Sequence, residues 1–378
     1  MQIAVQGCCH GELDVIYDTA IRNTSDYASL AVPKKYLQLG DFQKYYAAKR
    51  RAPILTVLIG GNHESSGYMR ELFYGGWVAP NMYYLGNSGA VTFNGLRLAG
   101  LSGIYYKSDL NLGHFEKPPY DHSTMRSAYH VRAFDVAKLS HICDKSPLDI
   151  MLSHDWPAGI EHRGNMKALL KKKKHFHDDI KNGQLGSPPA MHLLKTLKPR
   201  FWFSSHLHVK FAAIFKHKVT TKVENPDEIA IDLDDNTQVE TPSAGDTTAP
   251  KEDGPRFPEE TRFLALDKVL PRRDYMQILE IEPVSPIASN PSLSTNLCYD
   301  PEWLAITRVY HPYFTTSRTQ PLLPQNVEEL IQKERVWVAE NVKDLAIPKN
   351  FEITIPPHPK ELQPRHRITP VQCFLSSR

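Results

Sequence analysis

Four short segments of the sequence combine glycine or serine with side chains that bind metals or move protons. Each segment directly follows a run of apolar residues that is typical of a buried strand. The side chains with this chemistry are Cys8, His10, Asn62, His63, His154, His206 and His208. Loops that follow neighbouring strands lie at one edge of a sheet, so we expect these groups to meet in a single site.

Two of the segments carry a pair of ligand-type side chains separated by one residue. Cys8 precedes His10 in the first segment, and His206 precedes His208 in the last. In an extended chain, residues i and i+2 point to the same side, so each pair faces one way while Leu207 faces the core. Either pair alone is equally compatible with buried side chains that only form hydrogen bonds.

The segment from Gly60 to Glu64, which reads Gly-Gly-Asn-His-Glu, is more specific. The amide oxygen of Asn62 is a hard neutral ligand, and the adjacent His63 can transfer a proton. The two glycines allow the backbone to approach a ligand closely. In the remaining segment, His154 on its own would most often be a hydrogen-bonded core residue.

Taken together, the four segments predict a metal centre. Imidazole nitrogen, amide oxygen and thiolate sulfur form a mixed donor set that suits Mn²⁺, Fe²⁺ or Zn²⁺ better than Mg²⁺ or Ca²⁺. The soft thiolate of Cys8 favours Fe²⁺ or Zn²⁺ on its side of the site. Two cations about 3.5–4 Å apart can bind the oxygens of a phosphodiester and generate a hydroxide for in-line attack.

Apolar runs predict the buried strands that position these segments. The runs cover residues 2–6, 53–59, 82–85, 96–101, 148–152 and 201–203. A helix is predicted after the first run, because Leu13, Ile16, Tyr17, Ala20 and Ile21 share one helical face. Residues 23–52 contain no such run, and the alternation elsewhere indicates an α/β sandwich whose functional loops follow its strands.

The second half of the sequence changes character at residue 222. Residues 222–261 are rich in acidic residues, proline, threonine and serine, which predicts a disordered insertion. Residues 263–267 and 276–281 predict a returning pair of strands that completes the first domain. A proline-rich segment then leads to a smaller unit with one clear helix, whose apolar residues run from Val327 to Leu345.

Composition excludes several classes of protein. Hydrophobic residues make up 41% and charged residues 23% of the 378 positions, as in folded globular proteins. No apolar run reaches the roughly 20 residues of a membrane span, and the first residues lack the features of a signal peptide. The net charge of +3 is too small for a general nucleic-acid coat, so any polyanion site must be local. The five scattered cysteines argue against a disulfide framework and for a reducing compartment.

The order of the four segments resembles the calcineurin-like metallophosphoesterases. More narrowly, it resembles the RNA lariat debranching enzymes, whose first motif carries cysteine where most relatives carry aspartate. The motifs are Gly-Cys-Cys-His-Gly at 7–11, Gly-Gly-Asn-His-Glu at 60–64, Ser-His-Asp-Trp-Pro at 153–157 and His-Leu-His at 206–208. The resemblance covers nearly all of residues 1–221 and resumes over 262–283.

This resemblance implies an α/β/β/α metallophosphoesterase domain. The domain would span residues 1–221, be interrupted by the insertion at 222–261 and be completed by 262–283, with a C-terminal debranching domain at 284–378. The implied activity is that of a nuclear enzyme, which hydrolyses the 2′–5′ phosphodiester at the branch of excised intron lariat RNA. The sequence has no feature that indicates an oligomeric state.

The resemblance also implies a role for each motif residue. Cys8, His10 and His208 would bind one metal, and Asn62, His154 and His206 would bind the other. His63 would be the general acid that protonates the leaving 2′ oxygen. An aromatic loop after a predicted strand contains Tyr105, Tyr106, Phe115 and Tyr120. These rings would stack on a splayed branch nucleotide, although anchoring of the loop explains them equally well.

One motif of the family is not found in its expected form. Its members carry a Gly-Asp pair after a buried aliphatic strand, and the aspartate bridges the two metals. Here the predicted helix that ends near Arg22 runs straight into polar residues, as if a segment between about Thr19 and Asn23 were absent. Asp41, in Leu-Gly-Asp-Phe, offers a substitute but does not follow a strand.

Without a bridging carboxylate, two cations at that separation repel each other strongly. We therefore expect at most one bound metal, slow debranching, exposed edges on the neighbouring strands and reduced stability. Two alternatives remain open for the function. One is a phosphodiesterase that acts on other diesters, and the other is a catalytically inactive protein that binds lariat RNA.

Overall fold

The computed structural model describes residues 1–8, 20–142, 147–218, 258–283, 296–358 and 374–375. Within these ranges the strands form two sheets. One has the order β11-β1-β13-β2-β4-β3 and the other the order β12-β5-β6-β7-β8-β10-β9. The first sheet contains β1 (Gln2–Gln6), β2 (Leu55–Leu58), β3 (Gly76–Ala79), β4 (Met82–Tyr84), β11 (Met276–Glu280) and β13 (Phe374–Leu375). The second contains β5 (Ser88–Phe93), β6 (Leu96–Leu101), β7 (Ile150–Ser153), β8 (Phe201–Ser204), β9 (Phe211–Lys216), β10 (Glu260–Ala265) and β12 (Cys298–Tyr299).

The two sheets pack face to face around a shared apolar core. Ile3 and Val57 of the first sheet lie in one cluster with Leu98, Ile150 and Phe203 of the second. Burial of these side chains between two sheets is the main stabilising contribution to a sandwich of this kind. The predicted strand runs therefore form the centre of the molecule.

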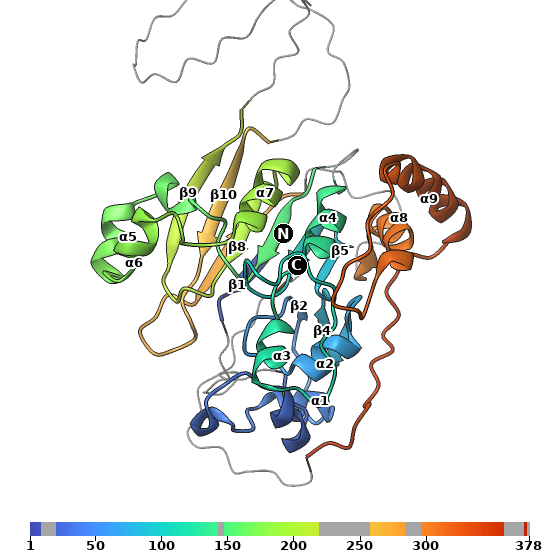
Figure 1. Ribbon diagram of the computed structural model, residues 1–378, viewed down its shortest axis with the longest axis horizontal. Helices are drawn as coiled ribbons and strands as arrows, with labels where there is room; N and C mark the ends of the chain where they lie inside the picture. Colours follow the sequence, from blue (N-terminus) through green and yellow to red (C-terminus); the bar gives the residue numbers. More distant parts are fainter. Residues whose placement is uncertain (9–19, 143–146, 219–257, 284–295, 359–373, 376–378) are drawn as a thin grey trace, which may run out of the picture.

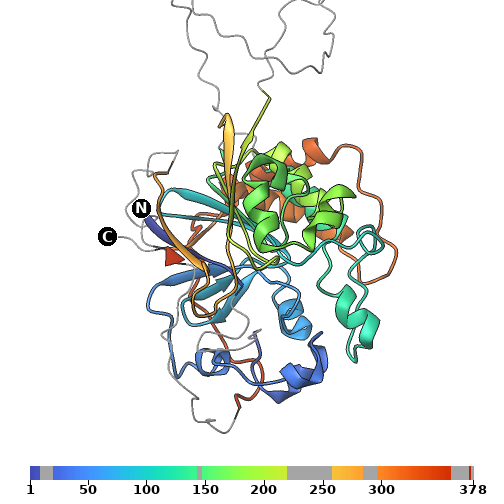
Figure 2. The same cartoon turned by 90° about the vertical axis from the view of Figure 1, so that its left-hand side faces the viewer.

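Helices cover the outer face of each sheet (Figure 1). Against the second sheet lie α4 (Ala133–Ser140), α7 (Pro188–Leu197) and α8 (Pro301–Tyr310). Against the first lie α1 (Phe42–Tyr46) and α2 (Ser66–Glu71). Figure 2 shows the green helices and the orange C-terminal helices on the same side of the sandwich. The predicted α/β/β/α architecture is confirmed.

The remaining helical elements lie in loops and in the C-terminal region. They are α3 (His122–Ser127), α5 (Met166–Lys172), α6 (Phe176–Lys181), α9 (Val327–Asn341) and the 3-10 turns at Thr24–Ser29, Lys34–Tyr36, Ile160–Arg163 and His311–Tyr313. α9 is the predicted C-terminal helix. The helix α8, against which it packs, was not predicted. Asp300 caps the N-terminus of α8 and Pro301 occupies its first turn. This Asp-Pro pair is a helix-start signal in the sequence that could have predicted α8.

One strand prediction needs correction, and two other predictions fall largely outside the described residues. The strands at 260–265 and 276–280 exist but do not pair with each other, because β10 joins β8 and β9 in one sheet while β11 joins β1 in the other. The chain between them crosses from sheet to sheet. Of the predicted helix at 13–21, all but residues 20 and 21 lie outside the described residues, as does most of the predicted insertion at 222–261.

The position between β1 and β2 is occupied by β13, a strand of two residues. Phe374 lies opposite Ala4 of β1 on one side and opposite Thr56 of β2 on the other. No strand occurs in the described stretch 20–54. We expected the facing edges of β1 and β2 to be exposed. β13 pairs with two residues of each strand, and the other residues of β1 and β2 have no partner in β13.

Candidate metal centre

The predicted site residues follow strands of both sheets. Cys8 follows β1, Asn62 and His63 follow β2, His154 follows β7, and His206 follows β8. β7 and β8 are parallel neighbours, so the loops that follow them leave the sheet side by side. The Ser205 N–H donates to the carbonyl of His154 at 3.2 Å and ties these two loops together.

Four of the predicted residues are brought together by direct contacts. The Nε2 atom of His154 lies 3.0 Å from Oδ1 of Asn62 and 3.2 Å from Nδ1 of His206. The backbone N–H of His206 donates to Sγ of Cys8 at 3.2 Å. Imidazole, amide and thiol groups from separate loops thus converge, and all four residues are partly exposed to solvent. Their roles as metal ligands remain predictions.

We expected an extended backbone at the His-Leu-His motif, and this expectation is wrong. His206 has a φ of 48° and His208 a φ of 51°, so both lie in the left-handed region that residues other than glycine rarely adopt. Leu207 still packs against the apolar core, as expected. Backbone strain of this kind is concentrated at functional sites, where the surrounding structure holds it in place.

Burial favours the neutral, metal-binding form of three of these histidines, His63, His206 and His208. It lowers the pKa of His206, and it lowers the pKa of His208 to about 3 with the help of nearby lysine charges. It also lowers the pKa of His63, as does the charge of His206. Burial raises the pKa of the Cys8 thiol to about 11, so a thiolate there requires a neighbouring cation.

The donor atoms fit a divalent cation. Separations of 3.0 and 3.2 Å between Asn62 Oδ1, His154 Nε2 and His206 Nδ1 are those expected for neighbouring ligands at about 2.0–2.2 Å from one metal. No three His, Cys, Asp or Glu side chains within the described residues are arranged to hold a metal by themselves, and Asn62 adds an amide oxygen beside His154.

Two predicted ligands are not placed in this cluster. His10 lies outside the described residues. Asp41 is buried just before α1, where its Oδ1 forms an ion pair with Nζ of Lys44 at 2.9 Å. Its role as a bridging ligand remains a prediction. His208 and His63 lie close enough to the cluster for their charges to interact with it.

Two residues that the sequence analysis did not single out support the site. Ser205 Oγ accepts the N–H of Cys8 at 2.8 Å and donates to the carbonyl of Leu266 at 2.8 Å. The charge of Asp155 opposes the lowering of the His206 pKa, and its Oδ2 accepts the N–H of Tyr105 at 3.3 Å. Both residues directly adjoin motif histidines in the sequence, which is the signal that could have identified them.

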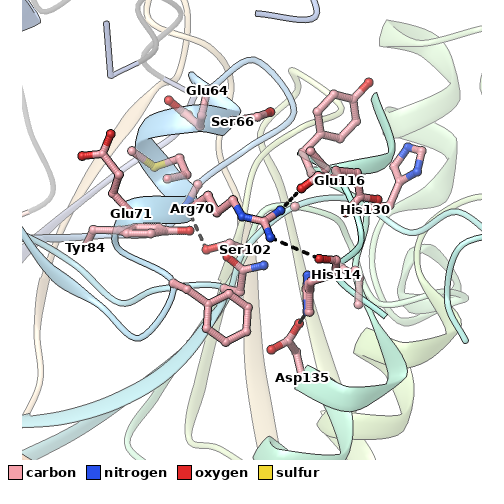
Figure 3. A pocket seen from close by; sticks show the side chains of 18 of the residues that line it. Glu64, Ser66, Arg70, Glu71, Tyr84, Ser102, His114, Glu116, His130 and Asp135 are labelled. Atoms are coloured by element: carbon pink, nitrogen blue, oxygen red, sulfur yellow. Dashed lines mark hydrogen bonds and ion pairs between the residues drawn. The ribbon is translucent and has the colours of Figure 1, made fainter. Parts of the chain in front are cut away.

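A pocket of about 380 Å³ opens beside the glycine loop at 60–61 (Figure 3). The Arg70 guanidinium donates to the carbonyls of His114 and Glu116 on its far wall. Tyr120, from the predicted aromatic loop, also lines this pocket, and its buried hydroxyl has no hydrogen-bond partner among the described residues. Figure 3 shows Glu64 near the helix α2 and His130 on the opposite side.

The other predicted aromatic residues lie elsewhere on the loop. The Tyr106 ring stacks on His130 with centroids 4.7 Å apart and is 52% exposed. The Phe115 ring lies 4.9 Å from the Arg318 guanidinium. Tyr105 contacts the site through its backbone N–H, which donates to Asp155. Tyr106 and Tyr120 are therefore the two rings best placed to meet a ligand.

Comparison with known proteins places this chain among named relatives. A calcineurin-like phosphoesterase family model matches residues 1–210, and a model of the lariat debranching enzyme C-terminal domain matches residues 258–373. The lariat debranching enzymes of Gallus gallus and Homo sapiens are 40% and 42% identical over 98% of this chain. That of Schizosaccharomyces pombe is 39% identical over 98% of it.

The chain covers 68% of the chicken relative, 67% of the human one and 94% of the fission yeast one. The family model of the C-terminal domain begins at residue 258 and so includes β10 and β11. β10 belongs to one sheet of the first domain and β11 to the other. The part of the chain that the structure describes has no helix both long and apolar enough to cross a membrane. The chain belongs to the lariat debranching enzyme family of calcineurin-like phosphoesterases and is a phosphodiesterase of the hydrolase class.

Proposed function

We propose that this chain hydrolyses the 2′–5′ phosphodiester at the branch of excised intron lariat RNA, and that it does so in the nucleus. The observation that carries the proposal is the convergence of Cys8, Asn62, His154 and His206 from both sheets. The names of the relatives support the same substrate.

Fe²⁺, Zn²⁺ or Mn²⁺ is the proposed cofactor. When bound, such a cation supplies positive charge to the phosphate oxygens and acidifies water for attack on phosphorus. Asn62, His154 and His206 would hold it, with Cys8 beside them. The neutral imidazoles need not release a proton to bind a metal, whereas the Cys8 thiol must.

His63 is the proposed general acid. It adjoins Asn62 in the sequence and lies near His206, so it is held beside the cluster. An alkoxide is a poor leaving group, and a positioned proton donor therefore gains about 10²–10⁴-fold in rate. Burial and the charge of His206 lower the pKa of His63, but the negative charge of a bound phosphodiester would oppose that shift. His63 would therefore be protonated when substrate is bound and would give its proton to the 2′ oxygen as the bond to phosphorus breaks.

We expect slow debranching because the Gly-Asp motif of the family is not found in its usual form. Because no bridging carboxylate follows a strand within residues 20–54, we propose that the chain binds one metal and debranches slowly. The charge of the second cation, which would otherwise stabilise the transition state, is then lost. A relative with the complete motif should be faster under the same conditions.

The aromatic loop and the pocket are proposed to bind RNA bases next to the branch. Single-stranded nucleotides bind by stacking on rings, and Tyr106 exposes its ring on this loop. The buried hydroxyl of Tyr120 can donate to or accept from a polar atom that enters the pocket. Both residues lie on the loop that the backbone of Tyr105 ties to Asp155, beside the metal cluster.

The experiment compares three substrates with each metal in turn. A synthetic branched RNA with a 2′–5′ linkage, a linear RNA of the same sequence and a simple chromogenic diester are incubated with the protein and Mn²⁺, Zn²⁺ or anaerobic Fe²⁺. Cleavage of the branched RNA alone is expected. Cleavage of the chromogenic diester alone would indicate a general phosphodiesterase. Binding of branched RNA without cleavage by any metal would indicate an inactive lariat-binding protein.

The location is tested separately. A fluorescent fusion of the full chain should concentrate in the nucleus of its own cell type. Exclusion of the fusion from the nucleus would contradict that part of the proposal while leaving the chemistry untouched.

A further inference from the structure

A histidine–aspartate pair lies on the aromatic loop, outside the metal cluster. Nδ1 of His130 lies 2.6 Å from Oδ2 of Asp109, and both side chains are largely buried. The Tyr106 ring stacks on the His130 ring, and the Tyr129 ring lies perpendicular to it with centroids 5.0 Å apart. Neither His130 nor Asp109 has a role in the hydrolysis proposed above.

The backbone of His130 is tied to the loop that follows β6. His130 pairs with Ile104 in a parallel bridge. The next residue along that loop, Tyr105, donates its N–H to Oδ2 of Asp155 at 3.3 Å. Asp155 adjoins His154 of the metal cluster in the sequence. A short path of backbone contacts therefore links the position of the His130 ring to the cluster.

The hydrogen bond with Asp109 decides which nitrogen of the His130 ring carries a proton. An ionised carboxylate can only accept, so the hydrogen lies on Nδ1. Burial raises the pKa of Asp109, but the hydrogen bond from His130 outweighs this effect and the pKa lies below its ordinary value. Burial lowers the pKa of His130, although Asp109 opposes the shift, and so favours a neutral ring. Nε2 therefore keeps its lone pair and is a hydrogen-bond acceptor.

Nε2 of His130 is open to a ligand. It forms no hydrogen bond within the part of the chain that the structure describes, and it is not sealed from solvent. The Tyr106 ring that covers His130 is itself 52% exposed. Single-stranded nucleotides bind by stacking on such rings, and a base on Tyr106 would bring its sugar close to the histidine.

An acceptor nitrogen selects a ligand that donates a hydrogen bond. The phosphate oxygens of RNA only accept, so they cannot pair with Nε2. The donors of a nucleotide are the N–H groups of its base and the hydroxyl of its ribose. The 2′-hydroxyl is present in every nucleotide whatever its base, and it is the group that distinguishes RNA from DNA.

We propose that His130 accepts a hydrogen bond from the 2′-hydroxyl of a nucleotide that stacks on Tyr106 next to the branch. Asp109 is the positioning residue, because it holds the proton on Nδ1 and leaves Nε2 as the acceptor. This inference rests on the proposed function, because it takes branched RNA as the ligand. The pair would recognise ribose without reading the sequence of the intron.

The test compares branched RNA with copies in which one ribose at a time is replaced by 2′-deoxyribose. Affinities are measured in EDTA so that no cleavage occurs. For the wild-type protein, one substitution next to the branch should weaken binding about 2–10-fold, as expected for the loss of one neutral hydrogen bond. His130→Phe keeps an aromatic ring beneath Tyr106 but has no acceptor, so it should bind the ribose and deoxyribose forms equally.

A second variant and a spectrum test the role of Asp109. Asp109→Asn places a donor against Nδ1 and moves the ring proton to Nε2, so it should also lose the preference for ribose. Nitrogen NMR of wild-type protein with labelled histidines should show the proton of the His130 ring on Nδ1. A wild-type ring with its proton on Nε2 would overturn the proposal.

The matched control is His122→Phe, the same change at an exposed position of α3 on the same loop. It should keep the preference of the wild-type protein for ribose. The measured quantity is the ratio of two affinities for one protein, so a general loss of RNA binding does not imitate the expected result. Circular dichroism confirms that each variant is folded.

The remaining outcomes decide against the proposal or separate it from the proposed function. An equal loss of affinity for both forms in His130→Phe would show that the ring only supports the loop, and the proposal would be wrong. It would also be wrong if no deoxyribose affected wild-type binding, or if His130→Phe cancelled only the effect of removing a base amino group. If the ribose preference is as expected but no metal supports cleavage, the contact stands and the proposed hydrolysis fails.

Discussion

Gly61 lies so close to His154 that a single carbon atom added at Gly61 would displace the His154 ring from Asn62 and His206. A Cβ atom on Gly61 would lie 2.6 Å from Cε1 of the His154 ring, whereas one on Gly60 would meet nothing closer than 3.5 Å. His154 contacts both Asn62 and His206, so displacement of its ring breaks both contacts. The glycine at 61 is therefore required by packing at the site, and the glycine at 60 is not.

Gly61→Ala should weaken metal binding about 10–100-fold, as the loss of a group that orients a metal ligand does. Gly60→Ala is the matched control, since it adds the same methyl group one residue earlier. Titration of each protein with Mn²⁺, followed by the rise in melting temperature, gives the two affinities. Equal metal affinities in the two variants would show that metal binding does not depend on the position of the His154 ring.

His63→Gln should lower the rate of debranching by about 10²–10⁴-fold, because it removes the proposed proton donor to the leaving oxygen. Metal content and RNA affinity should not change, since the prediction gives His63 no ligand role. His177→Gln, on the exposed surface of α6, is the control. Loss of metal from His63→Gln would instead show that His63 is a ligand.

Deletion of residues 374–378 should destabilise the protein by about 1–2 kcal/mol, because it removes the backbone hydrogen bonds of β13 to β1 and β2. Deletion of 376–378 alone leaves the paired residues in place and should have little effect. Thermal unfolding of the two truncated proteins makes the comparison. Identical melting temperatures would show that β13 adds nothing to the sheet.

Lys138 predicts a pH dependence of stability. Its ammonium group is buried 4.6 Å from the ring centroid of Trp303 and 5.4 Å from that of Tyr74. Burial lowers its pKa from 10.5 to about 8, although the charge of Asp135 opposes the shift. Between these two values the unfolded chain binds more protons at Lys138 than the folded chain does, so stability rises with pH across this window.

The matching variant is Lys138→Met, which keeps the length of the side chain and has no charge to titrate. From pH 7.5 to pH 10 the wild-type protein should gain up to about 3 kcal/mol relative to this variant. The midpoints of urea unfolding at the two pH values give the difference. Parallel changes in the two proteins would mean that Lys138 has its ordinary pKa in the folded state.

Local patterns in the sequence were sufficient for the strands and for the convergence of the donors. The apolar runs before Cys8, Asn62, His154 and His206 became β1, β2, β7 and β8. Hydrogen bonds link Asn62, His154 and His206 through their side chains and Cys8 through the backbone of His206, while the ligand roles of these residues stay predictions. This success has a physical cause, because a buried strand needs a continuous apolar run, and side chains that follow neighbouring strands share one edge.

Local patterns in the sequence could not predict which strands pair when they lie far apart in the chain. Nothing local in residues 263–281 shows that β10 and β11 enter different sheets, since both read as ordinary strands. Nothing in the residue types at 206 and 208 indicates the left-handed backbone that both histidines adopt. The same holds for β13, whose two residues find partners more than 300 positions away in the chain.

The most direct test of the central claim is a single-turnover reaction with a branched RNA labelled on its 2′-linked strand. Protein freed of metal with EDTA is mixed with the RNA, and Fe²⁺, Zn²⁺ or Mn²⁺ is then added. A slow release of the labelled strand that depends on the metal and disappears in His154→Ala is expected. Release at the same rate in EDTA, or bound RNA that no metal cleaves, would contradict the claim that the gathered donors hold a catalytic cation.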